Sequence, residues 1–570
     1  MMSVKRLGRA ALCLASVSLL ALAGGAQAAH RAVADSSRKT SMPQLVHENG
    51  KYALMVDGAP FFMLAGQANN SSNYPAALPK VWPAIADMHA NTLVMPVAWE
   101  QIEPAEGHFD FSFVDTLVQQ ARAHNVRLDI LWFGAWKNTG PSYTPQWVQR
   151  DNKRFPRMIA KDGSTSYCLS PHAETTREAD KKAYVALLSH IKAIDPQHTV
   201  IMLQIENEAG VYGTVRDYAP KAEALFNGQV PAALIQKIGQ KTGIKALKPS
   251  GTWSEVFGDD AEEYFQAWSV ASYAEDIARA GKAVLPLPTY MNDALRDALH
   301  PQKPGSYASG GPTYNVLDIY KAAAPDIDME EPDIYSHASD VYEANLGLYG
   351  RPDNALFVAE TGNAAVYAPK LYSVLGHQGI GFDPFGMDYT GYTNHPLGDD
   401  PVSFGPDEMK PFARVYGAFA PMQRVWARLS YESQVWGVSE PDDHAAQTLD
   451  LGPSWSAKVQ YRLFTFGLPE WDPQNKAGFP EGSETPRGGV AVARLDDHTF
   501  LVTGTQARIT FNGGPANKDR GLVQTIEEGH FDARGQWVFD RVWNGDETDY
   551  GLNFTAEPVV LKVTLSTYDK

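Results

Sequence analysis

The 570-residue sequence is poor in cysteine: it contains only Cys13 and Cys168. Because Cys13 lies in an N-terminal segment that we expect to be removed, we expect no disulfide within the mature chain. Cys168, in the stretch YCLSPH, has no evident base partner and is expected to be buried rather than reactive. The folded chain must therefore be stabilised by its core.

The chain also lacks an excess of positive charge. It carries 49 Lys and Arg against 66 Asp and Glu, which gives a formal net charge of -17. Nucleic acids and anionic membrane surfaces select basic protein surfaces. The charge balance therefore argues against a nucleic-acid partner and against a membrane-surface partner.

Several motifs are missing as well. No glycine-rich phosphate loop follows the first predicted strand, which disfavours a doubly wound nucleotide-binding sheet. No Gly-x-Ser-x-Gly indicates a serine esterase. No tight cluster of His, Cys or Asp suggests a metal, so we expect neither a metal nor another cofactor.

The N-terminus has the composition of an export signal. Lys5, Arg6 and Arg9 precede the apolar stretch AALCLASVSLLALAGGA, and AQA at 26–28 fits a small-x-small cleavage site. We therefore predict a signal peptide over residues 1–28 and a protein that is periplasmic or secreted. No attachment to the membrane is expected after cleavage.

Apolar runs and helical patterns alternate through the first two thirds of the chain. The stretch FVDTLVQQARAHN has helical spacing and is followed by the strand-like VRLDILWFG, and this exchange repeats until eight strands are predicted between residues 61 and 387. Near-continuous apolar strands separated by helices are typical of parallel sheets covered on both faces. We predict the α/β class, with a (β/α)8 TIM barrel over residues 44–430; an open doubly wound sheet is the rival.

The pattern changes beyond residue 430. Stretches such as GGVAVARLDDHTFLVTGTQARITFNGG alternate with period two and are broken by Gly, Asn and Asp. This predicts a C-terminal antiparallel β-sandwich-like domain over residues 431–570. It could bind sugar, cap the barrel or form a homodimer interface, and the sequence does not choose among these.

Two predicted strands end in carboxylates. The fourth ends in Glu206-Asn207-Glu208 and the seventh contains Glu360. Strands four and seven lie across the mouth of such a barrel, and glycoside cleavage needs two convergent carboxylates, one protonated and one ionised. A single strand-end glutamate more often only pairs with Arg or Lys, but two of them among aromatic residues favour catalysis. Period-two geometry would put Glu206 and Glu208 on one face if the strand continued as far as Glu208.

The motifs resemble a known group of enzymes. QIENE, VAETG and AWEQIEPAEGHFDF look like the retaining (β/α)8 glycosidases, and residues 45–429 most resemble the family 35 β-galactosidases, in a bacterial branch with a C-terminal β domain. The resemblance implies that Glu208 is the acid/base and Glu360 the nucleophile. It also implies that Asn207 binds the 2-hydroxyl of the sugar.

The sequence departs from the usual family pattern at two strand ends. GQANNSSNY replaces a first-strand Gly-Glu-x-His-Tyr type motif, and WFGAWKN replaces a third-strand Asn-Ala-Glu type motif. Trp253 is a further candidate for stacking on a sugar ring, and Tyr335 for hydrogen bonding to the nucleophile. The residues expected to bind substrate are thus Asn207, Gln67, Asn69, Asn70, Trp132, Trp136, Trp253 and Tyr335.

These expectations combine into one function with two alternatives. The sequence predicts a retaining exo-β-galactosidase that removes terminal β-D-galactosyl residues, for example from plant cell-wall oligosaccharides such as xyloglucan fragments. Another retaining glycosidase of the clan, acting on galactan, arabinosides or mannosides, is one alternative. A non-catalytic glycan-binding barrel is the other.

Overall fold

A computed structural model describes residues 41–239, 243–398, 403–463, 485–518, 520–532 and 534–568. The predicted signal peptide, residues 1–28, lies outside these ranges. Among the helices of the described residues, none combines the length and the apolar character needed to cross a bilayer. The first described residues form a small antiparallel sheet of β1 (Gln44–Glu48), β2 (Lys51–Val56) and β3 (Ala59–Phe61).

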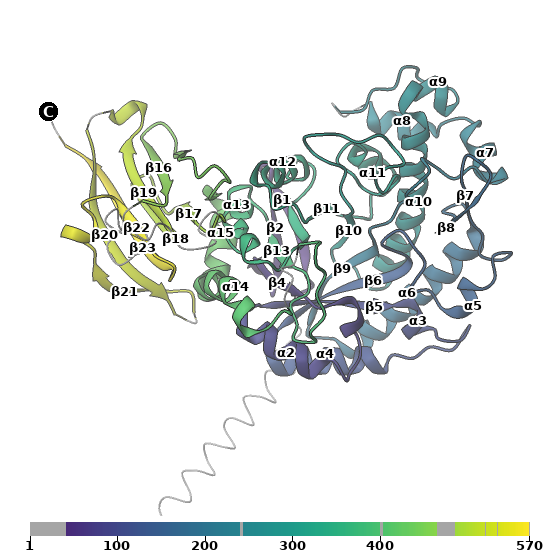
Figure 1. Ribbon diagram of the computed structural model, residues 1–570, viewed down its shortest axis with the longest axis horizontal. Coiled ribbons are helices and arrows are strands. Elements are labelled where there is room, and N and C mark those ends of the chain that lie inside the picture. The colour runs from purple at the N-terminus through teal and green to yellow at the C-terminus, as the bar shows by residue number, and fades with distance from the viewer. Residues whose placement is uncertain are drawn as a thin grey trace, which may run out of the picture.

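Eight parallel strands then close into a barrel, which confirms the predicted (β/α)8 architecture (Figure 1). Neighbouring strands follow the chain order around the barrel, so the fourth and seventh strands are separated by two others. The strands are β4 (Met63–Gln67), β5 (Thr92–Ala98), β6 (Arg127–Lys137), β9 (Val200–Asn207), β10 (Thr289–Asp293), β11 (Met329–Ile334), β12 (Phe357–Thr361) and β13 (Gly381–Pro384).

Helices cover the outside of the barrel. Every residue of β5, β9, β10, β11, β12 and β13 is buried, because one face of each strand fills the barrel interior and the other packs against helices. The longer helices are α2 (Leu78–Asp87), α4 (Ser112–His124), α6 (Glu174–Ile194), α10 (Ala261–Val284), α12 (Ser339–Tyr349), α14 (Pro406–Phe419) and α15 (Gln423–Glu432).

Short elements lie in the loops between these units. They include a two-stranded hairpin and several helices of one or two turns. These are α3 (Trp99–Ile102), α5 (Gln146–Gln149), β7 (Arg157–Ile159), β8 (Thr165–Leu169), α7 (Pro220–Phe226), α8 (Ala232–Ile238), α9 (Trp253–Phe257), α11 (Leu317–Ala323) and α13 (Lys370–Gly376).

Antiparallel sheets form the C-terminal domain, as predicted, and it lies on the side of the barrel where α13, α14 and α15 are found (Figure 1). One sheet has the order β14-β17-β18-β23-β20-β21 and the other β15-β16-β19-β22. Their bounds are β14 (Val435–Ser439), β15 (Gln447–Asp450), β16 (Trp455–Tyr461), β17 (Gly489–Arg494), β18 (Thr499–Thr505), β19 (Ala507–Gly513), β20 (Gly521–Phe531), β21 (Trp537–Val542), β22 (Leu552–Phe554) and β23 (Val559–Thr567). The proposed domain division at 430/431 falls in the last turn of α15.

The barrel and this domain meet where α13 packs on β14. Two glycines make the contact possible: a β-carbon on Gly437 would overlap the carbonyl oxygen of Tyr372, and one on Gly376 would overlap that of Gly437. The Oγ atoms of Ser373 and Ser439 lie 2.9 Å apart beside this contact. The two backbones therefore touch directly, without side chains between them.

Candidate active site

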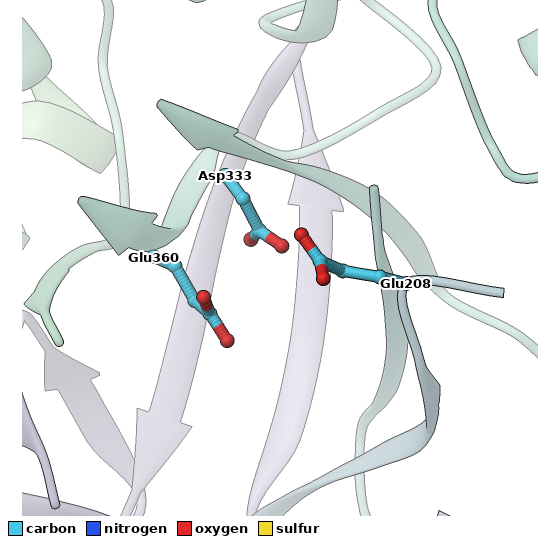
Figure 2. A group of neighbouring side chains, drawn as sticks. All are labelled: Glu208, Asp333 and Glu360. Atoms are coloured by element: carbon cyan, nitrogen blue, oxygen red, sulfur yellow. The ribbon is translucent and has the colours of Figure 1, made fainter. Parts of the chain in front are cut away.

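Three carboxyl groups converge at the carboxyl ends of the barrel strands. Glu208 directly follows β9, Asp333 lies in β11 and Glu360 lies in β12, and their side chains turn toward one another (Figure 2). One oxygen of each lies within 4.8 Å of one oxygen of each other group. Asp333 and Glu360 are 3% and 4% exposed, whereas Glu208 is only partly buried. The cluster therefore lines a site that solvent reaches from the Glu208 side.

Hydrogen-bond donors surround Glu360. Its Oε1 accepts from Gln67 Nε2 at 3.0 Å and from Asn207 Nδ2 at 3.4 Å, while its Oε2 accepts from the Tyr335 hydroxyl at 2.7 Å. These three side chains come from the first, fourth and sixth barrel strands or their ends. An ionised carboxylate can accept all three bonds, so the surroundings fit a charged Glu360.

Lys137 and Asn292 also hydrogen-bond to residues of the carboxyl cluster or to Asn207 beside it. Lys137, at the end of β6, donates from Nζ to Asn207 Oδ1 at 2.8 Å. Asn292, in β10, accepts from the backbone N–H of Glu208 at 2.9 Å and donates to Asp333 Oδ2 at 2.7 Å. Asn292 therefore links the fourth and sixth strand ends.

The three acids differ in how readily they ionise. Burial raises the pKa of Glu208 to about 7, with the Lys137 charge opposing this rise and Glu360 adding to it. Burial, followed by the charges of Glu360 and Glu208, holds the pKa of Asp333 well above its usual range. A carboxyl group with a pKa near neutrality can both give and take a proton, which is what general acid–base catalysis requires.

Glu206 and Glu208 do not share a face, because the strand ends before Glu208 and the condition for the expected alternation is not met. β9 ends at Asn207, and both glutamates have left-handed backbone conformations, with φ of 60° and 45°. Glu206 turns away from the carboxyl cluster and meets Asp180 of α6, and its Oε2 accepts from the backbone N–H of Trp136 at 2.8 Å. Such non-glycine conformations carry strain of about 1–3 kcal/mol and are concentrated at functional sites.

Asn69 and Asn70 lie in the loop that follows β4, near the first-strand residue Gln67. Asn69 donates from Nδ2 to Asp388 Oδ1 at 3.0 Å and from its backbone N–H to Asp388 Oδ2 at 2.9 Å. Ser72 donates to the same Oδ2 at 2.6 Å. Asn69 therefore joins the loops after the first and eighth strands, while Asn70 Oδ1 is buried and has no hydrogen-bond partner among the residues that the structure describes.

The three candidate tryptophans are buried, Trp132 and Trp136 against the helices that cover the barrel and Trp253 between α9 and α10. Trp132 donates from Nε1 to Asp180 Oδ1 at 2.8 Å, and the Trp136 ring meets Tyr273 of α10 edge-on at 4.7 Å. Trp253, in α9, is 1% exposed and packs edge-on against Phe265 of α10. For these residues the structure corrects the expected role: they are core residues in this arrangement.

Asp333 and Asn292 belong to the cluster but were not among the sequence candidates. Each lies near the end of a short strand, in PDIY and TYMN, among other polar residues of the same strand that do not set it apart. The one signal in the sequence was the placement of both at barrel strand ends. Lys137 lies in WFGAWKN, the stretch that departs from the family pattern and in which Lys137 was expected to help line the pocket.

Within the described residues, Glu208, Asp333 and Glu360 are also the one acidic group whose oxygens come close enough together to surround a cation. Donors already occupy both oxygens of Glu360 and one oxygen of Asp333. This pattern is that of a hydrogen-bonded acid cluster, and we assign no metal to it.

Comparison with known proteins finds similarity to β-galactosidases. Residues 84–283 match the β-galactosidase model of glycoside hydrolase family 42, and residues 412–555 match a domain of unknown function, DUF5597. The β-galactosidase BgaA of Thermus sp is 22% identical over 263 residues, which is 42% of this chain and 36% of that protein. A β-galactosidase of Thermus thermophilus is 21% identical over 263 residues, again covering 42% of this chain and 36% of that protein. The chain thus spans about a third of the length of these relatives.

The solved structures that match part of the chain include two β-galactosidases. That of the psychrophilic Marinomonas ef1 has a TM-score of 0.48 at 11% identity and covers 65% of this chain and 61% of its own. That of Bacillus circulans sp. alkalophilus has a TM-score of 0.44 at 14% identity, with 64% and 57% covered. Residues 84–283 are thus similar to the β-galactosidases of glycoside hydrolase family 42, which supports a glycoside hydrolase, and the expected family 35, of the same clan, is not supported.

Proposed function

We propose that the chain is a retaining exo-β-galactosidase that works by double displacement. Glu208 is the acid/base and Glu360 is the nucleophile. The observation that carries the proposal is the approach of the two carboxylates, whose nearest oxygens lie within 4.8 Å. Retaining glycosidases hold their carboxyl groups about 5–5.5 Å apart, whereas inverting ones hold them about 6.5–9.5 Å apart.

The surroundings of the two glutamates fit these roles. Glu208 has a pKa of about 7 because burial opposes its ionisation, so it can hold the proton that the leaving oxygen needs. Glu360 stands among three donors that suit its ionised form and orient it for attack on the anomeric carbon. Water then enters, Glu208 takes its proton, and the glycosyl–Glu360 ester is hydrolysed.

Asn207 contributes to both halves of the reaction. Its amide bridges Lys137 and Glu360, which fixes its orientation beside the nucleophile. In this proposal it also hydrogen-bonds the 2-hydroxyl of the sugar, a contact that strengthens in the transition state. Gln67, at the end of β4, and Asn69 and Asn70, from the loop after it, contact the remaining hydroxyls.

We propose galactose-terminated plant cell-wall oligosaccharides, such as xyloglucan fragments, as the substrate class. The predicted signal peptide supports this choice, because an exported enzyme meets glycans outside the cytoplasm. The names of the matched relatives support a β-galactoside in particular. Other retaining activities are separated from it by the relative kcat/KM on aryl β-galactoside, α-L-arabinoside and β-mannoside.

The test uses Glu360→Ala and Glu208→Ala with aryl β-galactosides. Each substitution should lower kcat by about 10²- to 10⁴-fold. Azide should rescue Glu360→Ala with an inverted galactosyl azide and Glu208→Ala with a retained one, because azide replaces the nucleophile in the first case and the deprotonated water in the second.

Glu100→Gln is the matched control, since Glu100 also follows a barrel strand but lies outside the carboxyl cluster. It should keep wild-type kcat. A Glu360→Ala enzyme with near wild-type turnover, or rescue with the opposite stereochemistry, would exclude the assignment. Tight binding of galactosides without turnover by the wild-type protein would favour a glycan-binding barrel.

A further inference from the structure

The third carboxyl group of the cluster has no role in a two-glutamate mechanism. Asp333 lies among Glu208 and Glu360, and it is as deeply buried as the nucleophile (Figure 2). Placing a third negative charge there would work against ionisation of the other two acids. Its protonation state therefore matters to the chemistry of Glu208.

The hydrogen bonds of Asn292 distinguish the two oxygens of Asp333. The backbone N–H of Glu208 can only donate, so the Asn292 atom that faces it at 2.9 Å must be the carbonyl oxygen. The amide nitrogen of Asn292 therefore faces Asp333 Oδ2, at 2.7 Å, and donates to it. Oδ2 is thus an acceptor, and any proton on Asp333 must sit on Oδ1.

Oδ1 is buried and has no donor among the described residues. The other carboxyl groups of the cluster lie within 4.8 Å, and they are acceptors when ionised. A buried carboxylate oxygen without a donor is costly, whereas a hydroxyl at the same place can donate to a neighbouring carboxylate. The arrangement is satisfied when Oδ1 carries the proton.

The charges around Asp333 favour the same state. Acids outnumber the bases that act on it, and the one cation among them is Lys137. Burial and these charges together hold the pKa of Asp333 well above its usual range. The charged and titratable groups that interact with Asp333 or Glu208 from the surrounding elements are Lys137, Glu208, Tyr212, Tyr290, Asp293, Tyr335, Tyr349 and Glu360.

We propose that Asp333 is a permanently protonated carboxylic acid whose Oδ1–H donates to the carboxylate of Glu208. It is a positioning residue: it orients the acid/base and stabilises its ionised form. The inference rests on the proposed role of Glu208. It adds a third acid that keeps its own proton throughout the cycle.

The proton count of the cycle is simple in this arrangement. In the first step Glu208 gives its proton to the leaving oxygen as the glycosidic C–O bond breaks, and Asp333 Oδ1–H donates to the carboxylate that remains. In the second step Glu208 takes a proton from water as the glycosyl ester is cleaved. The Asp333 proton is transferred in neither step.

The test compares Asp333→Asn with Asp333→Leu through the pH dependence of kcat/KM for an aryl β-galactoside. The basic limb of that profile reports the ionisation of the acid/base in the free enzyme. In Asp333→Asn the new amide nitrogen can replace the O–H donor while the new amide oxygen accepts from Asn292. This variant should therefore keep the limb in place and lower kcat/KM by less than about tenfold. Leucine removes the donor, raises the pKa of Glu208 and should move the limb up by about one unit or more.

Opposite shifts would overturn the proposal. If Asp333 were ionised, both variants would remove a negative charge, lower the pKa of Glu208 and move the limb down. A limb that moves in neither variant would assign Asp333 to packing alone. Asp129→Asn is the control, because Asp129 is a buried acid of the same barrel that bonds Tyr290 instead, and its substitution should leave the limb unmoved.

Infrared difference spectra separate this inference from the proposed function. At pH 7 the carbonyl-stretch band of one protonated carboxylic acid should be lost in Asp333→Asn relative to wild type. If the wild-type protein turns over no glycoside but the band is lost in Asp333→Asn, the proposed function is excluded while the protonation of Asp333 still holds. Absence of the band change would exclude the inference whatever the activity.

Discussion

Two glutamates separated by one residue have opposite environments at the end of the fourth strand. Glu208 faces the carboxyl cluster, while Glu206 pairs with Asp180 against the helix layer. Burial, and then the neighbouring charge of Asp180, raises the pKa of Glu206 well above its usual range. The left-handed backbone at both positions makes this separation possible, because a regular strand would point both side chains the same way.

The Tyr335 hydroxyl can be tested without altering either glutamate. Tyr335→Phe removes its 2.7 Å hydrogen bond to Glu360 Oε2. A hydrogen bond to a charged group contributes about 1.5–3 kcal/mol, so kcat/KM for an aryl β-galactoside should fall about 10- to 150-fold. The control is Tyr342→Phe, whose hydroxyl lies 3.3 Å from Thr361 Oγ1 in the core and whose loss should change kcat/KM by less than about threefold, which is what a small shift in packing produces. Equal rates for Tyr335→Phe and wild type would exclude a role for this bond in catalysis.

At the scale of secondary structure, α9 explains why Trp253, which was expected to stack on a sugar ring, is buried instead. The Thr252 side chain accepts a hydrogen bond from the backbone N–H of Glu255, and the Glu255 side chain accepts one from the backbone N–H of Thr252. This capping box makes the helix begin at Trp253. The cap directs Trp253 inward, onto α10. Its ring is therefore covered by protein rather than offered to a ligand.

Trp253→Ala should accordingly affect stability and not substrate binding. Truncating a large buried aromatic side chain lowers the free energy of unfolding by about 3–5 kcal/mol. Urea unfolding should show this loss, and KM measured well below the unfolding transition should match wild type. A KM raised tenfold in a protein of unchanged stability would instead place Trp253 at the substrate.

The elements were predictable from the sequence to a greater extent than the orientation of their side chains. The eight barrel strands follow from apolar runs between helical patterns, and Gln67, Asn207, Tyr335, Glu208 and Glu360 come together because each lies at a strand end. Which way Trp132 and Trp136 face could not be predicted, since a strand buried on both faces has no polar alternation to mark its two sides. Asp333 and Asn292 needed coordinates, because their role depends on a contact between strands.

At the scale of the whole molecule, buried acids link stability to pH. Burial raises the pKa of Asp129 to about 7 and that of Asp293 to about 8. In the unfolded chain an aspartate has a pKa near 3.9, so between about pH 4 and pH 8 the folded protein holds protons that the unfolded chain has released. Its stability must therefore fall as pH rises through that window.

We expect the thermal unfolding midpoint to be higher at pH 5 than at pH 9. Scanning calorimetry at pH 5, 7 and 9 measures it, and the double variant Asp129→Asn/Asp293→Asn should show a shallower decline. A midpoint that rises from pH 5 to pH 9 would contradict the assignment of these acids as neutral in the fold.

The contact of α13 with β14, here called the seam, can be tested by substitution. Gly437→Ala places a methyl group on the carbonyl oxygen of Tyr372, and backbone cannot move aside as a side chain can. The unfolding midpoint should fall. The control is Gly347→Ala, in the exposed face of α12 with nothing within 4 Å of the added carbon, which should raise stability by about 0.5–1 kcal/mol. Equal effects of the two substitutions would show that the seam is loosely packed.

That seam also limits how the protein can be redesigned. α13 follows the strand that carries Glu360, so a chimera that exchanges the C-terminal domain would alter the support of the βα unit to which Glu360 belongs. A foreign domain would need a glycine wherever it meets Gly376, or the helix would be displaced. Shortening the enzyme to its barrel would expose the face of α13 that packs on β14. A shorter enzyme is therefore better made by removing loops elsewhere.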